Sequence, residues 1–356
     1  MSRDFTAGVW LILTLELRQR VRGVAWYVLL GIFIVLVGLV TVLVWLAAGT
    51  WQAGGGLVFS AVVFFVLLLG TLVSPALSGN AINGDRDAGI LATTQVTLIS
   101  TGQLVVGKFL AAWITALAFL AAAVPFLLIA VLLGDVSIET VLASLLVLAA
   151  ELGVIAMIGV GLSGILTRPL FSIVVTYLMV ALLSLGTLIS FTLLGVATQS
   201  TVTSVDRTVL SSTYDDETGV ETDVVCSPPT VTTYETARFD YYWWLLAANP
   251  YVVVADAAPG TFDSTGNTVD LFGSIAVGVR GAQEPPELQQ QNNYCLTSGE
   301  YDGSDYPTAQ ETYDGATPSW FVGLGIHLLL GIGALVWAWR RTDTPARRLP
   351  TGSRIA

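Results

Sequence analysis

The stretch VLASLLVLAAELGVIAMIGVGLSGIL (residues 141–166) is separated by only Thr167, Arg168 and Pro169 from a second apolar stretch, LFSIVVTYLMVALLSLGTLISFTLLGVA (residues 170–197). Each stretch exceeds the roughly 20 apolar residues that a helix needs to cross a bilayer core of about 30 Å. Three residues leave no room for a domain between them. The sequence therefore predicts two antiparallel transmembrane helices at the centre of an all-α membrane protein.

Four more apolar runs lie on either side of this pair. They cover residues 26–48, 55–77, 109–133 and 319–339. The whole chain is 54% hydrophobic and 12% charged, whereas a soluble domain carries roughly 25% charged residues. We therefore predict six transmembrane helices, five of them within residues 25–197 and the sixth within residues 319–340, followed by a cytoplasmic tail at 341–356.

Residues 1–24 precede the first predicted span. The part from Phe5 to Arg22 is apolar in its first half and basic in its second half. A signal peptide has the reverse order, with the basic region before the apolar core. This order instead favours an amphipathic helix that lies on the cytoplasmic surface of the membrane.

The basic residues predict the orientation. Under the six-helix arrangement, 12 of the 15 Lys and Arg residues fall on one side of the membrane. These are Arg3, Arg18, Arg20, Arg22, Arg86, Lys108, Arg168, Arg340, Arg341, Arg347, Arg348 and Arg354. Because positive charge accumulates on the cytoplasmic side, both termini are expected in the cytoplasm. The single lysine against 14 arginines is typical of a GC-rich bacterial genome, which points to the bacterial plasma membrane.

Residues 198–318 are predicted to form an extracellular domain between helices 5 and 6. They hold 18 acidic and 3 basic residues. Such a surface repels nucleic acid and attracts cationic ligands, although it also serves simply as a solvated exterior. Both cysteines, Cys226 and Cys295, lie here. In an oxidising compartment two cysteines most simply form a disulfide, and two buried free thiols are the alternative.

An aromatic run from Tyr241 to Ala255 stands apart within this domain. It is too short to cross a bilayer, and Pro250 interrupts it. Since aromatic clusters favour the headgroup region, the run predicts an interfacial helix on the outer membrane face. A core element of the extracellular domain is the alternative.

Two ionisable residues fall inside predicted spans. Glu151 lies about 15 Å and His327 about 12 Å into the membrane from the outside, at the 1.5 Å rise of an α-helix. Intramembrane ionisable groups are costly and commonly functional. Their similar depths predict that the two side chains meet. A protonated Glu151 that only bridges helices is the structural alternative.

The sequence gives no sign of an active site. Residues 102–108 match the first seven positions of a phosphate-binding loop, but Phe109 stands where a hydroxyl must bind magnesium. His327 is the sole histidine, and no Cys pair has metal-ligand spacing. We expect no enzyme activity, no metal and no cofactor bound by this chain.

The segment between helices 2 and 3, residues 78–108, mixes charge with moderate apolarity. It contains Asp85-Arg86-Asp87-Ala88-Gly89-Ile90-Leu91, then Ile99-Ser100, then Gly107-Lys108. This order resembles the coupling segment of type-2 ABC transporter permeases, which show acidic-Arg-acidic-x-Gly-x-Leu, then Pro-apolar-Ser, then Gly-Lys. Leu98 stands where the family has proline, and Thr94-Gln95 replace a leucine pair.

The resemblance covers residues 1–197 and 319–340 and implies an exporter subunit. It implies that the chain forms half of a substrate pathway with a second permease subunit, as a homodimer or with a paralogue, within membrane lipid. Two separate ATPase subunits would bind the ATP. The residues implied in coupling to them are Asp85, Arg86, Asp87, Gly89, Leu91 and Lys108.

Two other functions fit parts of the sequence. A secondary transporter would use Glu151 as a proton carrier, but it predicts inverted repeats that the sequence does not show. A receptor or scaffold would act through the acidic domain, and it leaves residues 78–108 without a purpose.

Overall fold

The computed structural model describes residues 2–51, 54–89, 99–134, 136–215, 220–293, 295 and 307–343. Six helical segments are long and apolar enough to cross a membrane. They are α2 (Val24–Trp51), α3 (Gly55–Ser78), α6 (Thr101–Leu132), α7 (Ile138–Ile165), the α8–η1–α9 segment (Pro169–Ala181, Leu182–Gly186, Thr187–Ala197) and α14 (Trp320–Thr342). The prediction of a multi-pass helical membrane protein is thereby confirmed.

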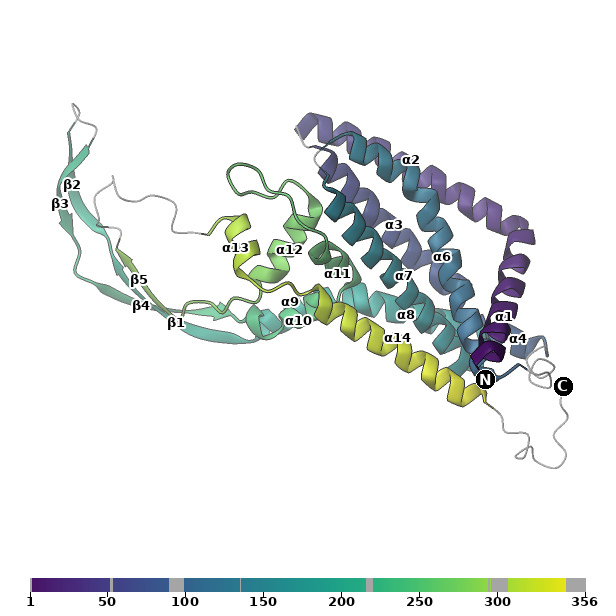
Figure 1. The fold of residues 1–356 in the computed structure, drawn as a ribbon. Helices are drawn as coiled ribbons and strands as arrows, with labels where there is room; N and C mark the ends of the chain where they lie inside the picture. The colour runs from purple at the N-terminus through teal and green to yellow at the C-terminus, as the bar shows by residue number, and fades with distance from the viewer. Residues whose placement is uncertain are drawn as a thin grey trace.

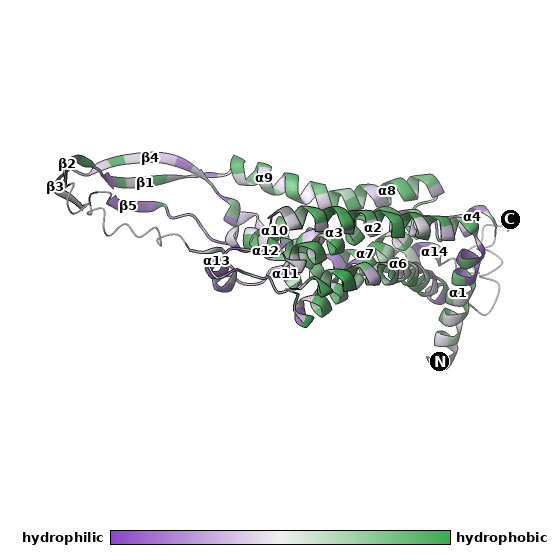
Figure 2. Cartoon of the chain, turned by 90° about the horizontal axis from the view of Figure 1, so that it is seen from above, coloured by the Kyte–Doolittle hydropathy of each residue, from purple (hydrophilic) through white to green (hydrophobic). Residues whose placement is uncertain are grey.

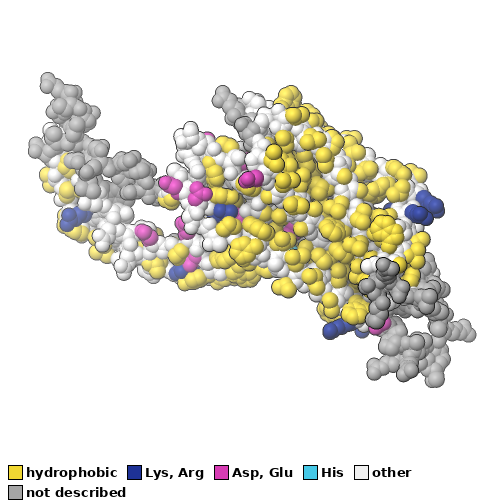
Figure 3. Space-filling view, in the orientation of Figure 1, with side chains coloured by type: hydrophobic (Ala, Val, Ile, Leu, Met, Phe, Trp, Pro, Cys, Tyr) yellow, Lys and Arg dark blue, Asp and Glu magenta, His cyan; other side chains and the backbone are white. Residues whose placement is uncertain are grey.

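These segments form one bundle with α3 and α7 at its centre (Figure 1). More than half of the apolar window of α3 and of α7 is buried, whereas less than a quarter of the window of α2 and of α14 is buried. Residues 151–161 of α7 are buried without interruption. Figure 3 shows apolar side chains spread over the visible face of the bundle, as expected for a surface that faces lipid.

The N-terminal helix α1 (Ser2–Arg22) turns away from α2 at Gly23 and packs beside the start of α6 (Figure 1). Val9, Ile12 and Leu13 are its buried apolar side chains, while Trp10 and Leu11 are exposed. A helix was expected here, and one is present. The first turn of α1 and the last turn of α14 lie at the same end of the bundle as the short helix α4 (Asn83–Asp87).

The third span begins earlier than its apolar run. Hydropathy predicted a start at residue 109, but α6 begins at Thr101. The reason is a capping box, in which the Ser100 hydroxyl accepts from the Gln103 amide and the Gln103 side chain accepts from the Ser100 amide. The sequence that resembled a phosphate-binding loop therefore lies within the first two turns of a helix.

The segment between α9 and α14 contains strands as well as helices. A three-stranded sheet has the order β4-β1-β5, formed by β1 (Gln199–Arg207), β4 (Thr230–Ala237) and β5 (Gln289–Asn293). The strands β2 (Val209–Asp215) and β3 (Val220–Cys226) form a separate hairpin. Together these five strands make a long projection, here called the β arm, which stands away from the helices in both views (Figures 1 and 2). The predicted all-α description therefore holds for the membrane bundle alone.

Short helices join the β arm to the bundle. They are η2 (Phe239–Tyr241), α10 (Trp243–Ala247), α11 (Pro250–Ala257), α12 (Leu271–Gly281) and α13 (Ala309–Gly315). The ring of Phe272 on α12 packs edge-on against Phe59 and Phe64 of α3. The aromatic run 241–255 is thus divided among three elements. Val253, Val254 and Ala255 are fully buried, which for this half favours a core element over an interfacial helix.

A buried carboxylate fixes the start of α14. Asp256 of α11 accepts hydrogen bonds from the Ser319 hydroxyl (2.9 Å) and the Trp320 amide (2.9 Å), and it pairs with Arg280 of α12 (2.7 Å). A carboxylate at a helix N-terminus satisfies otherwise unpaired amides and favours the helix dipole. The start of the last membrane helix is therefore held by the same short helices that join the β arm to the bundle.

Candidate functional site

Two charged clusters lie along α7, one near its middle and one at its end. We call them the intramembrane cluster (Glu151, His327 and the Ala248 carbonyl) and the α4 cluster (Glu16, Asp85, Arg86 and Lys108). Each joins helices that are far apart in the sequence. Together they contain half of the residues for which the sequence predicted a role.

Glu151 of α7 and His327 of α14 meet inside the bundle, as their depths predicted. His327 Nδ1 lies 2.9 Å from both Glu151 carboxylate oxygens. Only 1% of either residue is exposed. The opposite ring atom, Nε2, lies 2.9 Å from the Ala248 carbonyl oxygen at the end of α10.

The geometry limits where the protons of the Glu151–His327 pair can lie. A carbonyl oxygen only accepts, so His327 Nε2 carries a hydrogen and donates it. Nδ1 then either accepts from a protonated Glu151 or donates to an ionised one. In both cases one proton lies between the two side chains and the pair has no net charge. This arrangement relieves the cost of burying either group alone.

Small residues bring the two helices close enough for this contact. A Cβ atom added to Gly161 of α7 would lie 2.5 Å from the Ala334 Cβ atom of α14, and one added to Gly164 would lie 2.6 Å from that of Ala338. Small side chains let membrane helices approach closely. The same offset of about 174 residues relates each of these pairs and the Glu151–His327 pair, so α7 and α14 pack in parallel.

The intramembrane cluster also ties the short helices to the bundle. A Cβ atom on Gly323 would lie 1.9 Å from the Ala247 carbonyl oxygen, so only glycine admits the end of α10 here. Two residues further along the chain, Asn249 donates through Nδ2 to the Ser184 carbonyl (2.6 Å). Ser184 lies in η1, a π-helical turn, and such turns leave carbonyls open to outside partners. Sequence reasoning missed Ala248 and Asn249, for which only the Asn-Pro dipeptide was a signal.

At the other end of α7, hydrogen bonds hold the short helix α4 in place. The Ser163 hydroxyl of α7 accepts from the amides of Ile82 (2.9 Å) and Asn83 (3.0 Å). Arg86 donates through Nη1 to the Leu166 carbonyl (3.0 Å) and to Asn83 Oδ1 (2.8 Å). These bonds satisfy the start of α4 and the end of α7 at once, so the two helices are expected to move together.

Lys108 lies at the centre of the same cluster. Its ammonium group contacts Asp85 Oδ2 at 2.7 Å and also pairs with Glu16 of α1. The residue is 2% exposed. The N-terminal helix, α4 and α6 therefore meet at one buried cation. Glu16 was not among the residues singled out from the sequence.

The structure divides the residues predicted to couple to an ATPase into two groups. Asp85, Arg86 and Lys108 are engaged within this chain by the contacts above. Asp87 is exposed at the end of α4, and Gly89 has a φ of 69°, which glycine adopts without strain. Leu91 lies outside the described residues.

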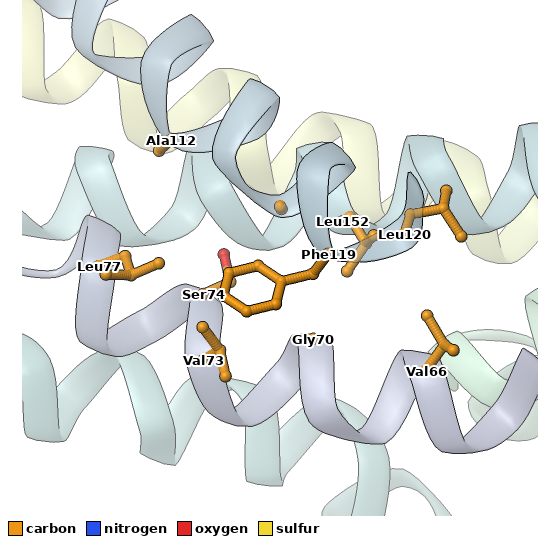
Figure 4. A pocket seen from close by; sticks show the side chains of 10 residues that line it. Val66, Gly70, Val73, Ser74, Leu77, Ala112, Phe119, Leu120 and Leu152 are labelled. Atoms are coloured by element: carbon orange, nitrogen blue, oxygen red, sulfur yellow. The ribbon is translucent and has the colours of Figure 1, made fainter. Parts of the chain in front are cut away.

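A narrow cavity lies between α3, α6 and α7 (Figure 4). Its volume of about 10 Å³ suffices for about one water molecule. The buried Ser74 hydroxyl, which has no hydrogen-bond partner, lines it together with Gly70, Phe119 and Leu152. This space is too small for an organic substrate.

Among the described residues no three His, Cys, Asp or Glu side chains gather in a way that holds a metal. The predicted disulfide between Cys226 and Cys295 is present and joins the end of β3 to the segment after β5. No protein-family model and no curated protein matches this chain.

Proposed function

We propose that the chain is the membrane-spanning permease subunit of an ABC exporter, powered by separate ATPase subunits. The observation that carries the proposal is α4. This short helix follows the second span and is fixed to α7, α6 and α1 by the α4 cluster. Its last residue, Asp87, is exposed, as is Ala88 directly after it. A rigidly mounted, exposed helix at the end of a bundle can transmit a partner's movement into the membrane.

The charge distribution supports the same function. In Figure 3, Arg and Lys side chains lie at the α4 end of the bundle, whereas most of the visible acidic side chains, with a few basic ones among them, lie where the β arm attaches. Positive charge is typical of cytoplasmic ends, which is where an ATP-binding partner must dock. The proposal therefore places both termini and α4 in the cytoplasm of a bacterial plasma membrane, with the β arm outside.

The surroundings of Glu151 favour a structural role for this residue within the proposed exporter. Both carboxylate oxygens of Glu151 face His327. The two side chains are buried between α7, α10 and α14. A proton carrier must exchange its proton with water on both sides of the membrane. The secondary-transporter alternative therefore has no observation in its favour.

The test is co-purification of an ATPase with the tagged chain from its native membrane. We expect Asp87→Lys to reduce the recovered ATPase about tenfold, an effect of roughly 1.4 kcal/mol. Glu139→Lys is the matched control, because Glu139 is an exposed acid in the first turn of α7, at the opposite end of the bundle. ATPase recovery that is equal in both variants, or ATP hydrolysis that persists after every partner is removed, contradicts the proposal.

A further inference from the structure

The strand β4 forms an open edge of the β arm. In the order β4-β1-β5 it is a terminal strand, and no described strand pairs with its outer side. Residues 230–235 are exposed. Since backbone N–H and C=O groups of alternate residues point to opposite sides of a strand, this edge presents a row of unpaired donors and acceptors.

Natural proteins usually protect such an edge, and on β4 the only such protection is one charged side chain, Glu235. Its sequence, TVTTYETA, contains no proline, lysine or glycine. It pairs with β1 in one uninterrupted register from Gln199↔Ala237 to Asp206↔Thr230. The hairpin of β2 and β3, by contrast, has two register shifts, which twist an edge away from neighbours. The pairing of β4 with β1 is therefore continuous, which leaves an outer edge suited to strand pairing.

Side chains hold this edge in its shape before anything binds. Tyr234 donates to Gln290 on β5 (2.9 Å), and Thr232 donates to Asp206 on β1 (3.1 Å). At the base of the strand, the Arg238 amide donates to the Thr198 carbonyl (2.9 Å) next to α9. A strand that is already ordered loses little conformational entropy on binding.

Charge selects the occupant. Residues 199–237 contain seven acidic residues and one basic residue, Arg207. A second copy of the arm would bring like charges together, whereas a basic segment is attracted. We propose that the outer edge of β4 binds an extended, basic polypeptide segment by strand addition, a mode in which main-chain hydrogen bonds supply affinity.

The experiment uses the full chain in lipid nanodiscs and a fluorescent peptide of eight residues. The peptide has a lysine at each end and in the middle, and valine and threonine alternate at its other positions. Fluorescence anisotropy measures binding. An analogue with glutamate in place of lysine tests the charge. A second kind of analogue tests the main-chain hydrogen bonds. In it, alternate backbone amides along one or the other edge of the peptide strand are N-methylated.

Val231→Lys is the test variant and Val225→Lys the matched control. Both valines are exposed, Val231 on β4 and Val225 on β3 of the separate hairpin, so the two variants change the net charge of the arm equally. We expect Val231→Lys to weaken binding of the basic peptide about tenfold and Val225→Lys to weaken it less than about twofold. An intact disulfide in both variants confirms that the arm has folded.

Several outcomes overturn the proposal. They are no binding of the basic peptide, equal binding of the acidic or N-methylated analogues, and equal effects of the two lysine variants. A second copy is tested with Thr233→Cys. Crosslinked arms that excess basic peptide does not prevent would assign the edge to another copy of the chain instead.

Discussion

The membrane bundle and the β arm maintain their shapes in different ways. In the bundle, α3 and α7 are surrounded by apolar side chains, and the ionic groups of both clusters are paired within the chain. In the β arm, most side chains of β4 face water, and a disulfide with a set of polar side-chain bonds secures the strands. A substitution that removes one partner in the bundle therefore leaves a buried polar or charged group that water cannot reach. In the arm, water can replace the lost partner.

This difference predicts where single substitutions matter most. A buried ion pair that loses one partner leaves the other uncompensated, which costs several kcal/mol. An exposed hydrogen bond is replaced by water and costs much less. The predictions below test this contrast, beginning with the largest expected effect.

Glu151→Ala is expected to destabilise the bundle by about 3–5 kcal/mol, because His327 remains buried without its partner. Thermal unfolding of the detergent-solubilised chain measures the loss. Glu139→Ala, an exposed acid on the same helix, is the control and should change stability by less than about 0.5 kcal/mol.

A double-mutant cycle sharpens this result. The pair of substitutions Glu151→Gln and His327→Ala should destabilise the bundle less than the sum of the two single costs, because each single variant removes the same interaction and leaves the other side chain without its partner. Strictly additive costs would contradict an energetic link between the two side chains.

Replacing both cysteines with serine is expected to affect the arm alone. The Cys226–Cys295 bond spans a sequence separation of 69 residues, and a disulfide of this kind stabilises a fold by about 2–4 kcal/mol. Protease cleavage within residues 199–237 should increase, while the unfolding temperature of the bundle stays constant. A bundle that melts earlier in this variant would show that the two regions are not independent.

The same contrast explains what the sequence could predict. A lipid environment imposes long apolar runs, so all six spans were located from the sequence. The early start of α6 was missed because polar capping at Ser100, rather than hydropathy, sets it. The strands of the arm were missed because their apolar residues alternate irregularly with Thr, Ser and Asp on a surface that is wet on both sides.

The candidate site shows the same limit. The depth of Glu151 and His327 along their helices predicted their contact, since helix rise is constant. The third member of that cluster, the Ala248 carbonyl, is a backbone atom from a short helix and carries no sequence signal. Likewise, Arg86 and Lys108 were recognised as important, but their partners Leu166 and Glu16 depend on how the helices pack.

Arg86→Ala is expected to lower the free energy of unfolding by about 1.5–3 kcal/mol, the range for hydrogen bonds to charged groups. The reason is that α4 loses its contacts with the end of α7. Under the proposed function, ATPase activity in the complex should become less dependent on substrate while the chain stays folded. Arg168→Ala is the control, because Arg168 is exposed in the neighbouring turn between α7 and α8. Equal stability of the two variants would show that the contacts of Arg86 do not hold α4.

The smallest expected effect concerns acid and the base of the arm. The Arg238 side chain donates to both oxygens of Asp240 (2.8 and 2.6 Å), and these bonds lower the pKa of Asp240 below its ordinary value. A carboxyl group whose folded pKa is depressed contributes stability above its unfolded pKa of about 3.9 and loses it as the pH falls through the folded value. Asp206 shifts in the same direction through bonds from Ser204 and Asn292. Acidification below about pH 4 should therefore loosen the arm but not the bundle.

Hydrogen exchange separates the contributions of these two carboxylates. After correction for the intrinsic rate, amides of residues 236–238 in the wild-type chain should exchange faster below about pH 4 than at neutral pH. In Asp240→Asn the same amides should already exchange faster at neutral pH and show little further change with acid, because the titrating group is gone. Asp206→Asn should instead alter amides near Thr232, since Thr232 donates to Asp206. Wild-type exchange at the arm base that is flat across this range, or acid-dependent exchange that survives in Asp240→Asn, would mean that the Arg238–Asp240 pair does not anchor the arm. The attachment would then rest on main-chain bonds such as that from the Arg238 amide to the Thr198 carbonyl.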